Sequence, residues 1–184
     1  MMKFFRAIIL VTLFPAAAFA ASDVDWNVST NPIALILGPN ARLHYKLNDH
    51  WTLGPEVGIV AVNVGDLKAN GFDLGFDAKY YFDEALTQHG WFVSGGVSYG
   101  TLKYKYTDSS NNNKESNANI HLATLRGLGG YQWFWGHFNL SLGAGLSFAS
   151  YNTNEVTDEN GNKTKDVPLH PVNLAADASL GWTF

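Results

Sequence analysis

The 184-residue chain contains no cysteine, no long apolar run and no basic cluster. Without thiols it can form neither disulfides nor zinc–thiolate sites, so strand pairing and burial must stabilise it. No stretch of eighteen consecutive apolar residues is present, which argues against a helical membrane protein. The 12 Lys and Arg residues are outnumbered by 16 Asp and Glu and are scattered. A nucleic-acid partner would need a basic footprint, so this class is not expected.

The first twenty residues differ from the remainder. Lys3 and Arg6 precede the short apolar run 7–14, and Ala18-Phe19-Ala20 places small residues where a signal peptidase reads. The pattern predicts a cleaved signal peptide over residues 1–20. Residues 21–184 keep 16 acidic side chains and the 12 basic ones less Lys3 and Arg6. Their length is that of a single domain.

The last stretch of the chain alternates strictly. One face reads Val172, Leu174, Ala176, Ala178, Leu180, Trp182, Phe184, and the other reads Asn173, Ala175, Asp177, Ser179, Gly181, Thr183. A period of two predicts a strand with one apolar and one polar face. The same period recurs over residues 23–30, 33–47, 51–64, 71–83, 91–106, 118–134 and 138–151. The sequence therefore predicts an all-β fold, an eight-stranded antiparallel transmembrane β-barrel with up-and-down meander topology, whose apolar face meets lipid. The first hairpin could turn at residues 31–32 or at 38–40.

Connection lengths and aromatic residues give the predicted barrel two different ends. The connections near residues 48–50, 83–90 and 135–137 are short and share one end, and those at 65–70, 107–117 and 152–168 share the other, where the last two are long and polar. A group of aromatic residues is expected to form a girdle at the end with short turns: Trp26, Tyr45, Trp51, Tyr80, Phe82, Trp91, Trp133, Trp135, Phe138, Trp182 and Phe184. All six tryptophans belong to this girdle, which indicates a lipid boundary.

The alternating strands, the signal sequence, the polar loops and the terminal Gly181-Trp182-Thr183-Phe184 resemble the small eight-stranded outer-membrane barrels of Gram-negative bacteria, the group of the outer-membrane protein A barrel domain and outer-membrane protein X. The resemblance covers residues 21–184. It implies a location in the cell outer membrane, contact with membrane lipid and lipopolysaccharide, and a monomeric barrel with its short turns on the periplasmic side. It also implies that the barrel assembly machinery reads Trp182 and Phe184.

Charged residues of both signs fall on the predicted inner face: Arg42, His44, Lys46, Glu56, Asp73, Asp77, Lys79, Arg126 and Asp177. Arg42 and Glu56 are equidistant from Asp49 and should face each other on neighbouring strands, with Lys79 within reach on the next. Ionised groups in a narrow lumen must be paired, so we expect four cations and four carboxylates to form a neutral structural network. The alternative is that they line a narrow pore.

A lipid A-modifying hydrolase is the other alternative function. It needs a serine, a histidine and a carboxylate together, and His121 with Glu115 lies near Ser98, Ser147 and Ser150 at one rim. No His-x-Ser occurs in the chain, however, and the acidic stretch 158–166 fails the calcium-loop pattern because its Gly is displaced and its final Glu is missing. We therefore expect no cofactor, no metal and no catalysis. The expected role is structural or surface-interacting, with an outside partner at loops 107–117 and 152–168.

Overall fold

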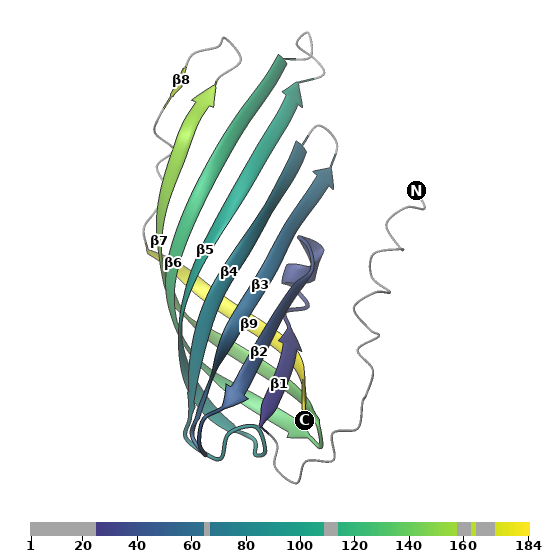
Figure 1. Ribbon diagram of the computed structural model, residues 1–184, viewed down its shortest axis with the longest axis vertical. Helices are drawn as coiled ribbons and strands as arrows, with labels where there is room; N and C mark the ends of the chain where they lie inside the picture. Colours follow the sequence, from purple (N-terminus) through teal and green to yellow (C-terminus); the bar gives the residue numbers. More distant parts are fainter. Residues whose placement is uncertain (1–24, 65–66, 109–113, 158–162, 165–171) are drawn as a thin grey trace, which may run out of the picture.

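The computed structural model describes residues 25–64, 67–108, 114–157, 163–164 and 172–184, so the predicted signal peptide lies outside the described residues. Nine strands and one short 3-10 helix follow in order (Figure 1). Their bounds are β1 Trp26–Thr30, η2 Ala34–Ile36, β2 Asn40–Lys46, β3 Trp51–Val64, β4 Leu67–Tyr81, β5 Gly90–Asp108, β6 Lys114–Trp135, β7 Phe138–Thr157, β8 Lys163–Thr164 and β9 Val172–Thr183. No helix in these ranges is long and apolar enough to cross a membrane.

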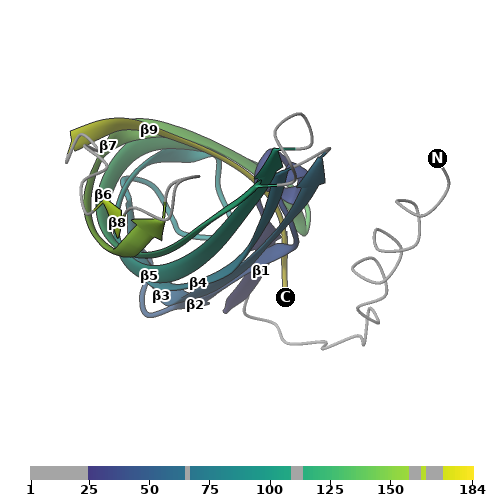
Figure 2. The same cartoon turned by 90° about the horizontal axis from the view of Figure 1, so that it is seen from above.

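The strands form a closed antiparallel ring. Each strand from β1 to β7 pairs with the next along the chain, and β9 closes the ring by pairing with both β7 and β1. The two-residue β8 pairs with β7 in the register that β9 uses, because Thr164 lies opposite Val156 and Val172 opposite Phe148, eight residues further along on each strand. Together β8 and β9 therefore occupy one strand position. Seen from above, the strands surround a central space (Figure 2). The predicted eight-stranded up-and-down barrel is confirmed.

Side chains alternate between the outside and the lumen as the sequence pattern requires. On β4, Phe72, Leu74 and Phe76 are exposed on the outer face, whereas Asp77 and Lys79 on the opposite face are buried. The same alternation on the other strands leaves an outer surface rich in exposed large apolar side chains. A surface of this kind is stable against hydrocarbon and unstable against water.

The connection between β1 and β2 differs from the prediction of a continuous strand over residues 33–47. Residues 33–37 form a turn around η2, and β2 begins only at Asn40. Asn31 makes this turn: its side-chain Oδ1 accepts the backbone N–H groups of Ile33 and Ala34 at 2.9 and 3.0 Å. Gly38, at φ +154°, then brings the chain against β3, where an added Cβ would lie 1.9 Å from the Ile59 carbonyl oxygen. Both proposed turn positions thus belong to one longer connection.

The other strands are longer than predicted at the end opposite the short turns. β3 and β4 stay paired up to Val64 and Leu67, so the expected connection at residues 65–70 reduces to two residues. β5 and β6 pair out to Asp108 and Lys114, and β7 continues to Thr157. These extensions project beyond β1 and β2 in Figure 1. The loops predicted at 107–117 and 152–168 are in part strand, and their remaining residues lie outside the described ranges.

The end with the short turns is closed by an apolar cluster inside the barrel. The β4–β5 turn folds inward and buries Ala85 and Leu86 to 0% and 1% exposure, with Leu86 at φ +66°. These side chains form one buried cluster with Tyr81, Phe92 and Phe134. The Ala85 N–H donates to the Asp49 carbonyl at 2.7 Å, which fixes the folded-in turn to the neighbouring one. We call these five residues the apolar floor.

Candidate functional site: a charge layer inside the barrel

Arg42 is the centre of a layer of paired charges above the apolar floor. Its Nε donates to Glu56 Oε2 on β3 at 3.0 Å, as expected from their equal distance to the Asp49 turn. Its two terminal nitrogens donate to both carboxylate oxygens of Asp177 on β9, at 2.8 Å each. The side chains of Glu56 and Asp177 are only 7% and 8% exposed. A bidentate guanidinium–carboxylate pair in such a setting fixes both geometry and charge, so Arg42 joins β2 to β3 and reaches past β1 to β9.

Arg126 extends the layer to β6. Its guanidinium forms a short ion pair with Glu56 Oε2 and lies 3.6 Å from Asp77 Oδ2. Asp77 also lies 3.2 Å from Nε2 of His44, which is 2% exposed. Glu56 therefore bridges two arginines, and the carboxylates of the layer are held from several strands at once. Breaking one such buried pair exposes the remaining charge to a low-dielectric interior.

Glycines on the inner face make room for these side chains. A Cβ added to Gly75 would lie 2.5 Å from Glu56 Oε1, and one added to Gly96 would lie 2.9 Å from Asp77 Oδ2. The two residues stand on neighbouring strands at the height of the charge layer. The lumen is thus filled by a few long charged side chains lying over residues that have none.

Three members of the predicted network occupy different positions from those expected. Lys46 lies on the inner face but pairs at the barrel rim with Glu84 at 3.2 Å and Asp49 at 3.5 Å. Lys79, 5% exposed, has its ammonium 4.8 Å from the centre of the Phe92 ring, a cation–π contact with the floor. Asp73 forms a hydrogen bond with Ser98 and no salt bridge to any described residue. The neutral set of four cations and four carboxylates is therefore incomplete, because Lys46 is engaged elsewhere.

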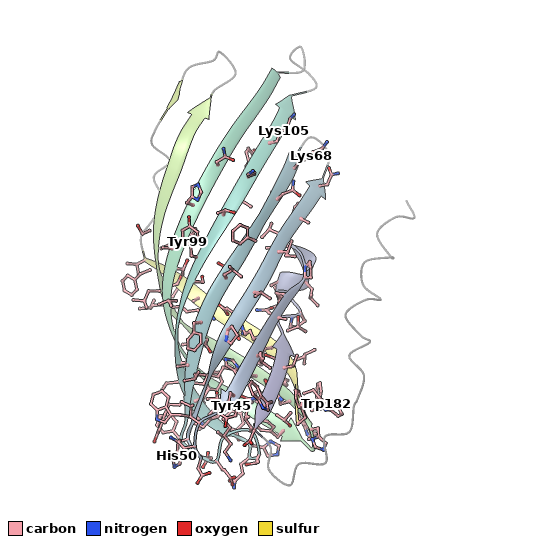
Figure 3. All side chains as sticks on the ribbon, in the orientation of Figure 1. Tyr45, His50, Lys68, Tyr99, Lys105 and Trp182 are labelled. Atoms are coloured by element: carbon pink, nitrogen blue, oxygen red, sulfur yellow. The ribbon has the colours of Figure 1, made fainter. Side chains whose placement is uncertain are left out.

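The predicted aromatic girdle lies together at the end with the short turns (Figure 3). Neighbouring rings meet at 4.7 Å between the centroids of Trp26 and Tyr45, 5.1 Å between Trp51 and Tyr80, and 5.9 Å between Trp135 and Phe138. The Phe184 backbone closes the seam, where its N–H and carbonyl exchange hydrogen bonds of 2.9 Å with Trp26. The other members lie on the same outer face: Phe82, Trp91, Trp133 and Trp182.

The sequence reading missed several contributors. Tyr131 stands between Trp91 and Trp133, at 5.2 and 4.8 Å, and completes that side of the girdle. His137 stacks on Trp182 at 5.6 Å. The inward Phe92 and Phe134 of the apolar floor were hidden by the tryptophans beside them. The even positions of these two phenylalanines in the alternation were the signal that could have revealed them.

The residues considered for a hydrolase are not assembled into a triad. The Tyr99 hydroxyl lies 3.0 Å from His121 Nδ1 on the outer face. Ser98 and Ser147 are on the opposite, inner face, and Ser150 shares the outer face opposite Ala123. The Glu115 side chain is outside the described part of the structure. Within the described residues, no group of three or more His, Asp or Glu side chains is arranged to hold a metal ion.

Two solved structures are similar to the chain. The N-terminal β-barrel domain of Pseudomonas aeruginosa OprF is 15% identical, with a TM-score of 0.46, over 88% of this chain and 96% of that one. A major outer membrane protein from Thermus thermophilus is 12% identical, with a TM-score of 0.49, over 88% and 99%. No curated protein matches the chain.

The closed ring of eight strand positions confirms the fold that the sequence resemblance implied. Comparison with protein families extends the match over nearly the whole chain. The protein belongs to the family described as "Protein of unknown function (DUF3575)", whose model matches residues 7–177.

Proposed function

We propose that the protein is an integral, non-catalytic barrel of the outer membrane, with a structural or surface-interaction role and a lumen that does not conduct ions. The observation that supports this most is the double filling of the lumen. The charge layer around Arg42 crosses the barrel from β2 to β6 and β9, and the apolar floor lies directly beneath it. An ion would have to break buried ion pairs and then pass an apolar constriction. Eight strands enclose a lumen just wide enough for side chains to fill.

The outer surface supports the membrane assignment. From Trp51 to Ile59 the outward side chains of β3 are apolar apart from Pro55, and Phe72, Leu74 and Phe76 lie beside them on β4. Nine residues of a tilted strand are about what a bilayer requires. The girdle marks the periplasmic boundary, where aromatic rings are favoured.

Lysines mark the other boundary and suit the phosphates of lipopolysaccharide. Lys68 on β4 and Lys105 on β5 lie directly opposite each other on the outer face, and Lys103 is on the same face one step nearer the membrane (Figure 3). Like charges facing each other across two strands are destabilising, and a phosphate between them relieves the repulsion. The hairpins above these lysines are where we place an outside partner. Trp182 and Phe184 would be recognised by the assembly machinery before the monomeric barrel closes.

Conductance tests the proposal directly. The chain lacking residues 1–20, folded in a planar lipid bilayer, should give no discrete current steps. The matched positive control is the double variant Phe92→Ala/Phe134→Ala, which removes two rings of the apolar floor and should increase ion leakage. Steps from the unaltered protein would assign it to the pores instead. Folding is checked by comparing gel migration with and without boiling, and an unchanged migration would count against a barrel.

The hydrolase alternative is tested separately. Mass spectra of lipid A from cells with and without the protein should be identical. A loss of an acyl chain that depends on the protein would overturn the non-catalytic assignment. The variant His121→Ala would then show whether the Tyr99–His121 pair takes part.

A further inference from the structure

The two faces of the β3–β6 sheet exchange polarity beyond the membrane band. Below the exchange, the outer row containing Ile59 and Phe72 is apolar and exposed. The next outer rows are polar, and they run Ala61, Asn70, Lys103, Asn119 and then Asn63, Lys68, Lys105. The inner rows at these heights run Val60, Gly71, Leu102, Ile120 and then Val62, Ala69, Tyr104, Ala118. This outer part therefore has the pattern of a water-soluble barrel that holds an apolar ligand.

The inner rows remain partly accessible. Val60, Val62, Leu102 and Ile120 are half-buried, and only Ala69, at 9% exposure, is buried among these two rows. Their uncovered surface faces the lumen because the outer face at these positions belongs to the polar rows. We call these eight inner residues, with Leu122 below them, the apolar cup.

A cavity of about 190 Å³ lies at the bottom of the apolar cup. Its charged lining comes from Arg42, Glu56, Asp73 and Arg126, and Val60 belongs both to the cavity and to the cup. The η2 connection forms one side, with Ala34 and Leu37 among the lining residues. This volume equals the share of liquid occupied by roughly six water molecules, enough for a small polar head group.

The charges around the cavity are unbalanced. Arg42, Lys79 and Arg126 are the cations of the layer, while Glu56, Asp73, Asp77 and Asp177 are its carboxylates. The layer, with His44 neutral, therefore contains one more carboxylate than cations. Both arginines are bound to carboxylates, whereas Asp73 is bonded to Ser98 alone among the described side chains. Gly58 and Gly100 flank Asp73 across the two neighbouring strands, so no side chain from these positions covers it.

We propose that the cavity and the apolar cup together bind a single-chain amphiphile with a positively charged head. Its ammonium group lies beside Asp73 and supplies the missing cation, and its hydrocarbon chain runs outward along the Val60 and Val62 rows. A phosphate or sulfate head would instead face an excess of carboxylate in a poorly hydrated lumen, which is unfavourable. A small inorganic cation would satisfy Asp73 but leave the apolar rows without a partner.

Titration calorimetry tests this with the folded chain lacking residues 1–20 in zwitterionic nanodiscs and with empty nanodiscs as the blank. Octylammonium, kept below its micelle concentration, should bind saturably at one site. Octyl sulfate, which tests the head charge, and ammonium ion, which tests the chain, should show no saturable binding. Asp73→Asn should weaken octylammonium binding about tenfold or more, the loss expected for one charge-assisted contact. The matched control Asp83→Asn removes the same charge from an exposed turn and should leave binding unchanged.

A second variant keeps the test decisive if Asp73→Asn folds poorly. Ile120→Asn leaves the charge layer intact and makes one cup row polar, so it should weaken octylammonium binding while preserving heat-dependent gel migration. Equal affinities for octylammonium and octyl sulfate would overturn the proposal. So would equal octylammonium binding by Asp73→Asn and Asp83→Asn, or tight binding of ammonium ion alone. None of these outcomes affects the conductance result, so the two proposals fail independently.

Discussion

Replacing Arg42 with alanine is the most direct test of the charge layer. The substitution removes three charge-assisted hydrogen bonds, one to Glu56 and two to Asp177. It leaves two carboxylates whose side chains are 7% and 8% exposed, so solvent can compensate little. Three such bonds at about 1.5–3 kcal/mol each set a ceiling that relaxation and water entry reduce. Removing one partner of a buried ion pair costs about 3–5 kcal/mol, which is the destabilisation we expect.

The assay is reversible urea unfolding in lipid vesicles, followed by tryptophan fluorescence. The midpoint should fall with little change in slope, because the surface exposed on unfolding is nearly the same. Lys46→Ala is the matched control. Its partners Glu84 and Asp49 are 41% and 79% exposed, and an exposed ion pair contributes about 1 kcal/mol or less.

A double variant separates the buried charge from general damage. Adding Asp177→Asn to Arg42→Ala neutralises one of the two stranded carboxylates, so the double variant should be more stable than Arg42→Ala alone. A midpoint for Arg42→Ala no lower than that of Lys46→Ala would refute the buried network. A double variant less stable than Arg42→Ala would show that the stranded charge is not the cause.

Three further predictions concern other parts of the barrel. Arg126→Ala should lower urea resistance by about 2–4 kcal/mol, because Glu56 retains Arg42; unchanged resistance would mean that the ion pair adds nothing. Gly54→Val should abolish folding in vesicles, since an added Cβ would lie 1.7 Å from the Leu43 carbonyl oxygen. Gly129→Ala, with nothing within 4 Å of its Cβ, should leave the folding yield unchanged, and equal yields would contradict the predicted close approach at Gly54. The tryptophan girdle should be quenched more by lipids brominated near the head group than by those brominated near the chain end, and the reverse order would place it at the wrong depth.

The barrel itself could be predicted because alternation acts on every residue of a strand. Arg42 and Glu56 could be paired from their equal distances to Asp49, since an antiparallel hairpin fixes which residues face each other. The same arithmetic could not give Asp177 as the second partner of Arg42. That contact reaches past β1, and only the closure of the ring brings β9 within reach.

The sequence failed where local contacts or neighbouring side chains override alternation. Ile33, Leu35 and Leu37 alternate like a strand, yet the Asn31 side chain caps a helical turn there. Lys46 follows the inward pattern but is close enough to the rim to reach Glu84. The polarity reversal at residues 103–106 could be seen in the sequence. Its counterpart on β3 was hidden, because Ile59-Val60-Ala61-Val62 is apolar on both faces.

The joint between β1 and β9 has a consequence for how the barrel is completed. Only four residue pairs join these strands, from Asn27 with Thr183 to Thr30 with Leu180. Directly above them, Asp177 accepts hydrogen bonds from Arg42 and from Asn31. Sealing the cylinder therefore depends on a salt link that reaches around the shortest strand. A newly made chain that has not yet aligned β2 would leave a bare carboxylate at the seam, and this charge would oppose premature closure until the first hairpin is in place.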